Sequence, residues 1–153
     1  MKLKDAKPRH WDGHMEADYV YTSGIAGERF FRTLVETGKL SGTNCPKCGI
    51  VYVPPRMYCE RCFTELTAWK ELDPKGTVET FTVAYVDEAD KKLKKPRVWA
   101  FIRIDGANGG LVHNLENVEP SKVTVGMKVG AVLKPRKERK GEITDILHFE
   151  PGK

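Results

Sequence analysis

Four cysteines in two closely spaced pairs constrain this chain more than any other feature of its sequence. The pairs are Cys45-Pro-Lys-Cys48 and Cys59-Glu-Arg-Cys62, with ten residues between them. Two such pairs can place four thiolates at the corners of one tetrahedron, the geometry of a structural zinc site. Because thiolates would fill all four positions, none is left for water or substrate, and the site is predicted to be structural. Iron in a rubredoxin-like centre stays open as an alternative, and so do two disulfides or free thiols, although this spacing favours metal.

The residues around each pair indicate how the turns are built. Pro46 has a preset φ, and Gly49 tolerates the positive φ that such a turn often needs. The second pair is followed by Phe63 instead of glycine, so its turn has to form without that freedom. A ribbon of about 30 residues cannot bury enough core to fold alone, so we expect the metal to stabilise it.

Composition is that of a globular protein. Of the 153 residues, 40% are apolar and 31% are charged. No apolar run approaches the ~18 residues that span a bilayer, and the first residues lack the apolar segment of a secretory signal. We therefore expect a cytoplasmic protein without a membrane partner, and in the cytoplasm paired cysteines favour metal over disulfides. The net charge of +5 mildly favours an anionic partner.

Patterning divides the chain into an extended N-terminal arm (1–23), a helix (24–38), a zinc ribbon (39–73) and an OB-fold domain (74–153). In the helix, Ser23 is a candidate cap and Gly38 a candidate stop. Apolar residues recur at helical spacing at Ile25, Phe30, Phe31, Leu34 and Val35. This apolar stripe has to pack on something, either the chain's own β-domain or ribbon, or a partner protein.

Residues 77–150 have the pattern of a small β-barrel. The segment 97–105 alternates strictly, with Val98, Ala100, Ile102 and Ile104 on one face and Arg97, Trp99, Phe101 and Arg103 on the other. Further strands are expected at 77–86, 111–115, 123–135 and 142–150, with charged hairpin loops at 87–97 and 134–142 and a turn at 106–110. Five strands suit a Greek-key barrel such as an OB-fold, so the predicted class is mainly β.

No catalytic site is evident in the sequence. His10 and His14 fall in a segment without helical pattern and are expected to face solvent. His113 and His148 fall in predicted strands, where a histidine is more commonly a hydrogen-bonded surface or half-buried residue than a catalytic base. Nucleophile-elbow, dinucleotide-binding and phosphate-loop motifs are absent. We therefore predict that the chain is not an enzyme.

The order of helix, four-cysteine ribbon and barrel, together with several short motifs, resembles one known family. The motifs are Phe30-Phe31, Thr37-Gly38-Lys39-Leu40, Cys45-Pro-Lys-Cys48-Gly49, Val51-Tyr52-Val53-Pro54-Pro55-Arg56, Cys59-x-x-Cys62, Trp69, Lys75-Gly76-Thr77-Val78 and Val125-Gly126-Met127-Lys128-Val129. They are similar to those of the rubredoxin-like zinc-ribbon plus OB-fold proteins that accompany thiolases, a family long regarded as a domain of unknown function.

The resemblance implies a non-catalytic partner of acyl-CoA enzymes. Archaeal members of that family sit between acetoacetyl-CoA thiolase and HMG-CoA synthase, early in the mevalonate pathway, and contribute to a shared pocket for coenzyme A. Other relatives pair with sterol-degrading hydratases and aldolases. The resemblance also implies that the four cysteines are the metal ligands of this chain.

The first functional hypothesis is therefore a scaffold subunit of a thiolase–HMG-CoA synthase type complex that contributes to coenzyme A binding. Coenzyme A carries a 3′-phosphate and a pyrophosphate, which lysine and arginine bind as charge-assisted donors. The candidate ligand-binding residues are Lys91, Lys92, Lys94, Lys95 and Arg97. A solvated basic loop is the alternative interpretation of this run.

The second hypothesis is a single-stranded nucleic-acid binder, with RNA as the ligand. OB-folds bind strands with basic grooves and stacking aromatic side chains. Trp99, Phe101 and Arg103 would share one face of one strand. The same row of residue types is typical of protein interfaces, so it is a candidate face for either kind of partner.

Overall fold

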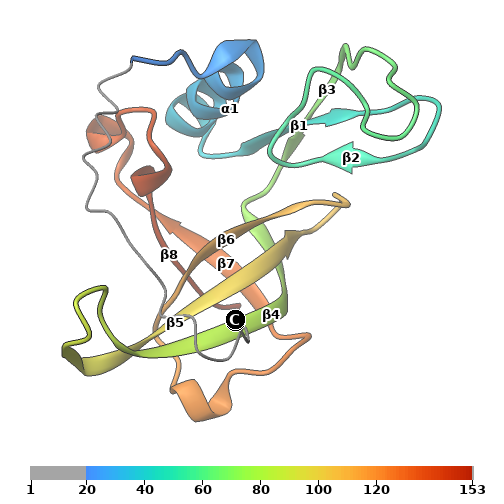
Figure 1. The fold of residues 1–153 in the computed structure, drawn as a ribbon. Helices are drawn as coiled ribbons and strands as arrows, with labels where there is room; N and C mark the ends of the chain where they lie inside the picture. The colour runs from blue at the N-terminus through green and yellow to red at the C-terminus, as the bar shows by residue number, and fades with distance from the viewer. Residues whose placement is uncertain (1–19, 153) are drawn as a thin grey trace, which may run out of the picture.

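The structure is a computed structural model that describes residues 20–152. One helix comes first, a three-stranded ribbon follows, and five strands then close into a barrel (Figure 1). The prediction of a mainly β chain with a helix, a ribbon and an OB-like barrel is confirmed. The elements are α1 (Gly24–Thr37), β1 (Leu40–Asn44), β2 (Val51–Tyr52), β3 (Ala68–Leu72), β4 (Lys75–Val86), β5 (Lys92–Ile104), β6 (Gly110–Leu115), η2 (Pro120–Lys122), β7 (Lys128–Leu133), η3 (Arg136–Glu138), η4 (Ile143–Asp145) and β8 (Ile146–Pro151).

Helix α1 ends as the sequence predicts but begins by a different means. Gly38 adopts the left-handed conformation (φ 73°), and its N–H donates to the Leu34 carbonyl, which is how such a stop works. The prediction that Ser23 caps the start is wrong, because its side chain makes no capping hydrogen bond. Instead, Thr22 Oγ1 accepts a hydrogen bond from the Gly24 N–H at 3.1 Å. Within residues 20–152, no helix is long and apolar enough to cross a membrane.

The apolar stripe of α1 packs mainly inside the chain. Phe30 and Leu34 are buried in the same hydrophobic core as the barrel. Arg139, from the connection after β7, donates through Nη1 to the carbonyls of Leu34 and Val35 at 3.2 and 3.4 Å, and so satisfies acceptors that the last helical turn leaves free. Packing on the chain's own β-domain therefore accounts for the stripe, except that Ile25 stays exposed.

The barrel closes in the strand order β4-β5-β6-β8-β7, and β7 returns to pair with β4. All neighbours are antiparallel except β6 and β8, which are parallel and meet at Leu115 opposite Phe149. The predicted alternation in β5 is confirmed. Its buried residues are Val98, Ala100, Ile102 and Ile104, and its exposed or half-buried residues are Arg97, Trp99, Phe101 and Arg103.

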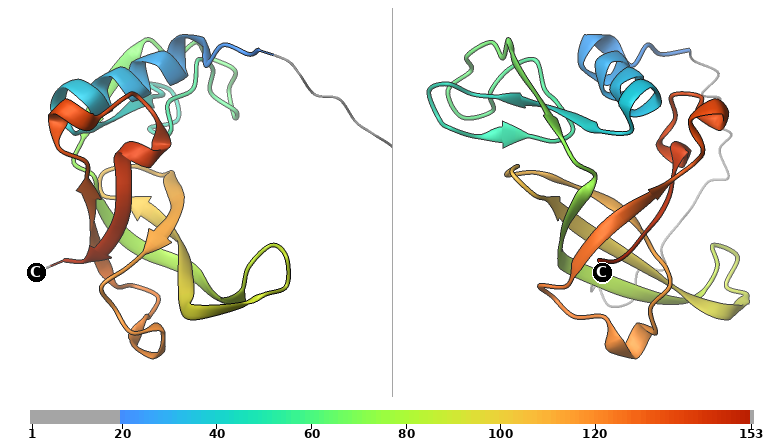
Figure 2. Two further views of the ribbon diagram at one scale, coloured as in Figure 1. Left: turned by 90° about the vertical axis from the view of Figure 1, so that its left-hand side faces the viewer. Right: turned by 180° about the vertical axis from the view of Figure 1, so that it is seen from behind.

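The β4–β5 hairpin differs from the loop predicted at 87–97. Strand β5 already begins at Lys92, so the second half of that prediction is wrong. Only residues 87–91 form the turn, which is closed by a hydrogen bond from the Asp87 N–H to the Lys91 carbonyl at 2.9 Å. The hairpin extends well past the closed part of the barrel (Figures 1 and 2). Since this part of the hairpin projects into solvent, the lysine side chains at the start of β5 stay hydrated while the two strands remain paired.

One buried carboxylate organises the connection between β7 and β8. Asp145 is fully buried and accepts hydrogen bonds from the N–H groups of Lys140, Gly141 and Glu142 at 2.9, 2.7 and 3.2 Å. The ammonium of Lys134 lies 3.5 Å away. Burial by itself raises the pKa of a carboxyl group, but these donors outweigh it and hold the pKa of Asp145 below its ordinary value.

The ribbon rests on the barrel through the turn between β5 and β6. The Asn108 N–H donates to the Val51 carbonyl at 2.9 Å, and the Val51 N–H donates to Asn108 Oδ1 at 2.9 Å. Beside this pair, Gly109 lies so close to the ribbon that a Cβ on it would be 2.5 Å from the Val53 oxygen. The ribbon and α1 therefore lie together at one end of the barrel (Figure 2).

Candidate functional site

The two cysteine pairs form two turns with the same backbone pattern. In the first, the Gly49 N–H donates to the Cys45 carbonyl at 2.8 Å. In the second, the Phe63 N–H donates to the Cys59 carbonyl at 2.9 Å. Gly49 and Phe63 are both left-handed, with φ of 68° and 55°. The second turn therefore takes the backbone path of the first, with phenylalanine in a conformation that glycine adopts far more easily.

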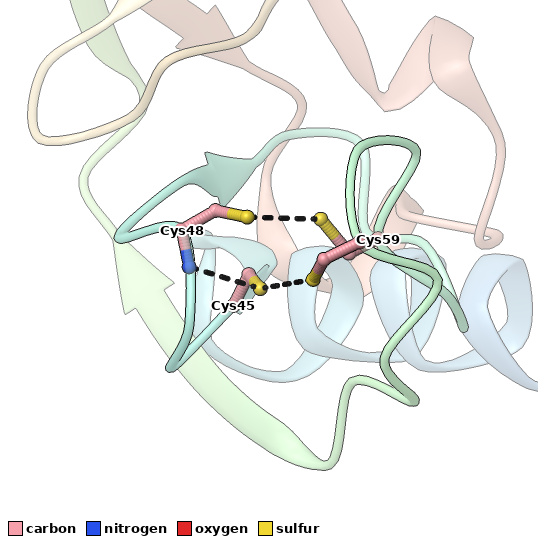
Figure 3. Close-up of side chains that lie close together, drawn as sticks. Cys45, Cys48 and Cys59 are labelled. Carbon is pink, nitrogen blue, oxygen red and sulfur yellow. Dashed lines mark hydrogen bonds between the residues drawn. The ribbon is translucent and has the colours of Figure 1, made fainter.

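The four thiols converge on one point. All four sulfurs lie within 4.8 Å of one another, and Figure 3 shows three of the cysteines pointing inward from the two turns. Cys45 and Cys62 are 3.5 Å apart at sulfur, and Cys48 and Cys59 are 3.9 Å apart. Tetrahedral zinc with Zn–S bonds of about 2.3 Å needs sulfur separations of about 3.8 Å. A disulfide needs about 2.05 Å, so the disulfide alternative is wrong, and the geometry fits one four-thiolate metal ion.

Hydroxyl groups next to the sulfurs favour the thiolate form that a metal requires. The Tyr52 hydroxyl lies 3.3 Å from the Cys59 sulfur. This hydrogen bond lowers the pKa of Cys59 to about 6 and raises the pKa of Tyr52 to about 12. Thr64 Oγ1 lies 3.3 Å from the Cys62 sulfur and lowers the pKa of that thiol in the same way. The two pairs therefore differ: these hydroxyl groups favour the thiolate form of Cys59 and Cys62 in the second pair, whereas hydrogen bonding to Cys62 raises the pKa of Cys48 in the first pair to about 12.

The predicted ligand-binding residues divide into two groups. Lys94, Lys95 and Arg97 line a cavity of about 1050 Å³ between β5 and the segment that follows β6. Lys91 and Lys92 are not among the residues that line it. The remaining walls combine Asn114, Asn117, Glu116 and Glu119 with apolar groups from Leu93, Pro96, Val98, Leu115, Val118 and Pro120. Its volume slightly exceeds the usual range for small-molecule sites, about 300–1000 Å³.

An irregular strand pairing shapes the basic wall of this cavity. Ala84 lies opposite Arg97, and Val86 lies opposite Lys92. Between these pairs β4 has one residue, Tyr85, whereas β5 has residues 93–96. Such bulges bend a strand and redirect its side chains, and they are common beside functional sites.

Trp99, Phe101 and Arg103 lie on the outside of the barrel. Trp99 is 41% exposed and Phe101 is half-buried, next to the exposed Val112 of β6. Arg103 donates to the Glu79 carboxylate through Nε at 2.9 Å and also through Nη2. The charge of Arg103 is therefore matched within the chain, and the face combines the rings of Trp99 and Phe101 with polar neighbours such as Thr80, Thr82 and Asn114 on the paired strands.

The two described histidines have structural surroundings. The His113 ring packs on Phe149, with 5.7 Å between centroids, and burial lowers the pKa of His113. His148 lies between Glu116 and Glu150, at 3.5 and 3.7 Å. Within residues 20–152, neither histidine hydrogen-bonds a serine, threonine or cysteine. His10 and His14, predicted to face solvent, lie outside the described residues.

Sequence reasoning missed two residues that the structure places at or beside the metal centre. Tyr52 is the buried hydrogen-bond partner of Cys59, but a strand of two residues has no periodicity that would identify its inward side chain. Asn108 holds the ribbon to the barrel, yet in a glycine-rich segment an asparagine is an ordinary turn residue. Neither residue carries a local signal for its long-range contact.

Two family models match consecutive parts of the chain. The model described as the ChsH2 rubredoxin-like zinc ribbon domain matches residues 32–67. The model described as the ChsH2 C-terminal OB-fold domain matches residues 69–134. These ranges follow the order of ribbon and barrel in the structure.

Individual relatives agree with these matches. A DUF35 domain-containing scaffold protein of Methanocaldococcus jannaschii is 34% identical over 128 residues, which cover 80% of this chain and 89% of the relative. A crystal structure of a DUF35-family protein of unknown function from Sulfolobus solfataricus is 36% identical, with a TM-score of 0.59 over 71% of this chain and 77% of that one. The Ltp2-ChsH2(DUF35) aldolase matches at 23% identity, with a TM-score of 0.55 over 80% and 91% of the two chains, and this likeness concerns the fold.

Proposed function

Since this chain belongs to the DUF35 family of zinc-ribbon and OB-fold proteins, we propose that it is a non-catalytic partner subunit of an enzyme complex. The Methanocaldococcus relative is a scaffold protein by name, and the Ltp2-ChsH2 structure pairs a DUF35 chain with an aldolase. The metal site supports this role, because four thiolates leave no open position for substrate. The described histidines also lack the contacts of a catalytic base.

We further propose that the partners are enzymes of the thiolase and HMG-CoA synthase type and that the chain contributes to coenzyme A binding. The observation that carries this proposal is the cavity of about 1050 Å³ whose basic wall holds Lys94, Lys95 and Arg97. The phosphates of coenzyme A suit three such donors, and the apolar lining suits its pantetheine arm. Lys91 and Lys92, at the turn end of β5, stay candidates for longer-range attraction.

A charge-reversal pair tests the cavity. Lys94→Glu with Lys95→Glu is expected to weaken coenzyme A binding to the assembled complex by roughly tenfold or more, because charge-assisted hydrogen bonds to phosphate are lost. Titration calorimetry of the reconstituted complex measures the affinity. The matched control is Lys137→Glu with Lys140→Glu, which changes the net charge equally in the exposed connection between β7 and β8. If the two double variants bind coenzyme A with equal affinity, the segment around Lys94 is a solvated basic strand that does not contact the ligand.

The outer face with Trp99, Phe101 and Arg103 is our candidate contact surface for a partner. The pairing of Arg103 with Glu79 favours a protein over nucleic acid, since a matched arginine has little attraction for phosphate. Purifying the tagged chain from its own cells with and without nuclease separates the two. Enzymes that remain bound after nuclease treatment support the protein interface, and loss of all bound material supports RNA.

A further inference from the structure

We propose that Phe63 is an anchor residue with which the zinc ribbon docks into an apolar hollow on the surface of a partner enzyme. The inference rests on the proposed function, because it takes an enzyme subunit as the occupant. Beyond the proposed function, it names the zinc ribbon as the part of the fold that contacts the enzyme and Phe63 as the residue that contributes most to the binding.

Phe63 has a backbone conformation that is unusual for a bulky residue. Phe63, Asp90 and Asn117 are the non-glycine residues with positive φ in residues 20–152. Aspartate and asparagine adopt this region comparatively readily, whereas a bulky residue does so at a cost in free energy. The equivalent position of the first turn is Gly49, which has no such cost. The first turn thus has the residue that adopts positive φ most easily, whereas the second has a residue that adopts it at a cost in free energy.

Within residues 20–152, no packing offsets this cost. Phe63 is 79% exposed, and Tyr58 in the same turn region is 60% exposed. Tyr52, by contrast, is buried beside the metal site and is 5% exposed. An exposed ring on a strained backbone contributes little to the folding of the isolated chain. Strained residues that persist are concentrated at functional sites, which points to a contact outside the chain.

The charges around the turn indicate what kind of partner makes this contact. The segment from Arg56 to Glu65 carries two arginines and two glutamates, and the Arg56–Glu60 pair is closed at 2.5 Å. Nucleic acids and anionic membranes attract an excess of positive charge, which this balanced segment lacks. Aromatic anchors within a polar rim are typical of protein–protein interfaces.

The turn also holds Phe63 in a fixed position. Its own N–H donates to the Cys59 carbonyl, and the Cys59 N–H donates back to the Thr64 carbonyl, both at 2.9 Å. Cys62, the residue before Phe63, is one of the four clustered thiols. A ring presented on a fixed backbone loses little further freedom on binding, and such preorganisation strengthens an anchor contact.

Replacing Phe63 separates folding from docking. Phe63→Gly and Phe63→Asn both suit a left-handed position and remove the ring. The zinc-loaded variants are expected to keep one metal per chain and a Tm equal to or above that of the wild type. Their affinity for the purified thiolase or synthase partner is expected to fall roughly tenfold or more. The control is Val125→Asn, because Val125 is 67% exposed in the loop before β7, which lies at the far end of the barrel from the ribbon (Figure 1).

Unchanged affinity of both Phe63 variants for an enzyme that binds the wild type would overturn the inference and leave the proposed function intact. If the wild-type chain binds neither enzyme, the proposed partners are wrong, and a photo-crosslinking phenylalanine analogue at position 63 then decides the inference in the source cells. A crosslink to a different enzyme, with binding that Phe63→Gly also weakens, supports the anchor. Crosslinks only to RNA, to lipid or to a second copy of the chain, or none at all, overturn it.

Discussion

The zinc ribbon and the barrel touch each other but are stabilised by different means. The barrel shares one continuous apolar core with α1 and with the base of the ribbon. The outer ribbon has a separate small core of Cys45, Tyr52, Cys59 and Leu66, in which two of the four members are clustered thiols. Apolar burial can therefore hold the barrel alone, whereas the outer ribbon needs a metal ion. One chain can therefore contain two units with separate conditions for folding.

Removing two of the four clustered cysteines is expected to have the largest effect, and to affect the ribbon far more than the barrel. Cys45→Ser with Cys48→Ser is expected to release the metal and unfold the outer ribbon, because structural zinc binding contributes about 10–16 kcal/mol in small zinc domains. Hydrogen exchange should show lost protection from Cys59 to Leu66 and retained protection in β5. Metal analysis of the wild type also decides between zinc, which is colourless, and iron, which is red. Retention of one zinc per chain by the double variant would show that the ligand assignment is wrong.

Replacing Asp145 is expected to have a smaller effect, on the stability of the barrel and its dependence on pH. Its pKa is lower in the folded chain than the value of about 3.9 for an unfolded aspartate. Ionised Asp145 therefore stabilises the fold above about pH 4, and this contribution is lost as the pH falls from there through the folded value. Asp145→Asn is expected to lower stability at neutral pH by about 2 kcal/mol and to flatten the acid dependence.

Urea unfolding measures this effect at a series of pH values. The Cys45→Ser, Cys48→Ser background is needed, because acid also displaces metal from thiolates in the wild-type ribbon. Glu138→Gln in the same connection serves as the control, since Glu138 is exposed and does not take part in the hydrogen bonds to Asp145, so this variant should leave the acid dependence in place. If stability still falls with acid in Asp145→Asn, a group other than Asp145 causes the acid dependence.

The smallest effect is expected at the junction of the two units. Asn108→Ala removes the side-chain acceptor of the Val51 N–H and should cost about 1 kcal/mol. The stability is expected to be lost at the junction alone, so hydrogen exchange of the Val51 amide should accelerate. Hydrogen exchange in β5 and the metal content should stay as in the wild type. Equal acceleration in the ribbon and the barrel would mean that the two units unfold together, contrary to the comparison.

Local patterns predicted the parts of the fold that depend on near neighbours. The left-handed stop at Gly38 and the two faces of β5 follow from residues within a few positions, and both are confirmed. The predicted loop at 87–97 is wrong in its second half, because a charged segment can be a strand where its side chains face solvent. Strand pairing there is decided by β4, whose Val86 lies opposite Lys92. The Ser23 cap is wrong because Thr22 supplies the acceptor instead.

The spacing of Cys45, Cys48, Cys59 and Cys62 is enough to predict one four-cysteine cluster, because it permits few arrangements other than a tetrahedral shell. The inward-facing side chains of β5 are predictable as well, because the period of a strand is two. Three further features become visible only in the folded chain: Lys94 and Lys95 line a cavity, Asn108 joins the ribbon to the barrel, and Phe63 is both left-handed and exposed. These features depend on segments far apart in the chain or on a backbone angle, and a pattern of neighbouring residue types specifies neither.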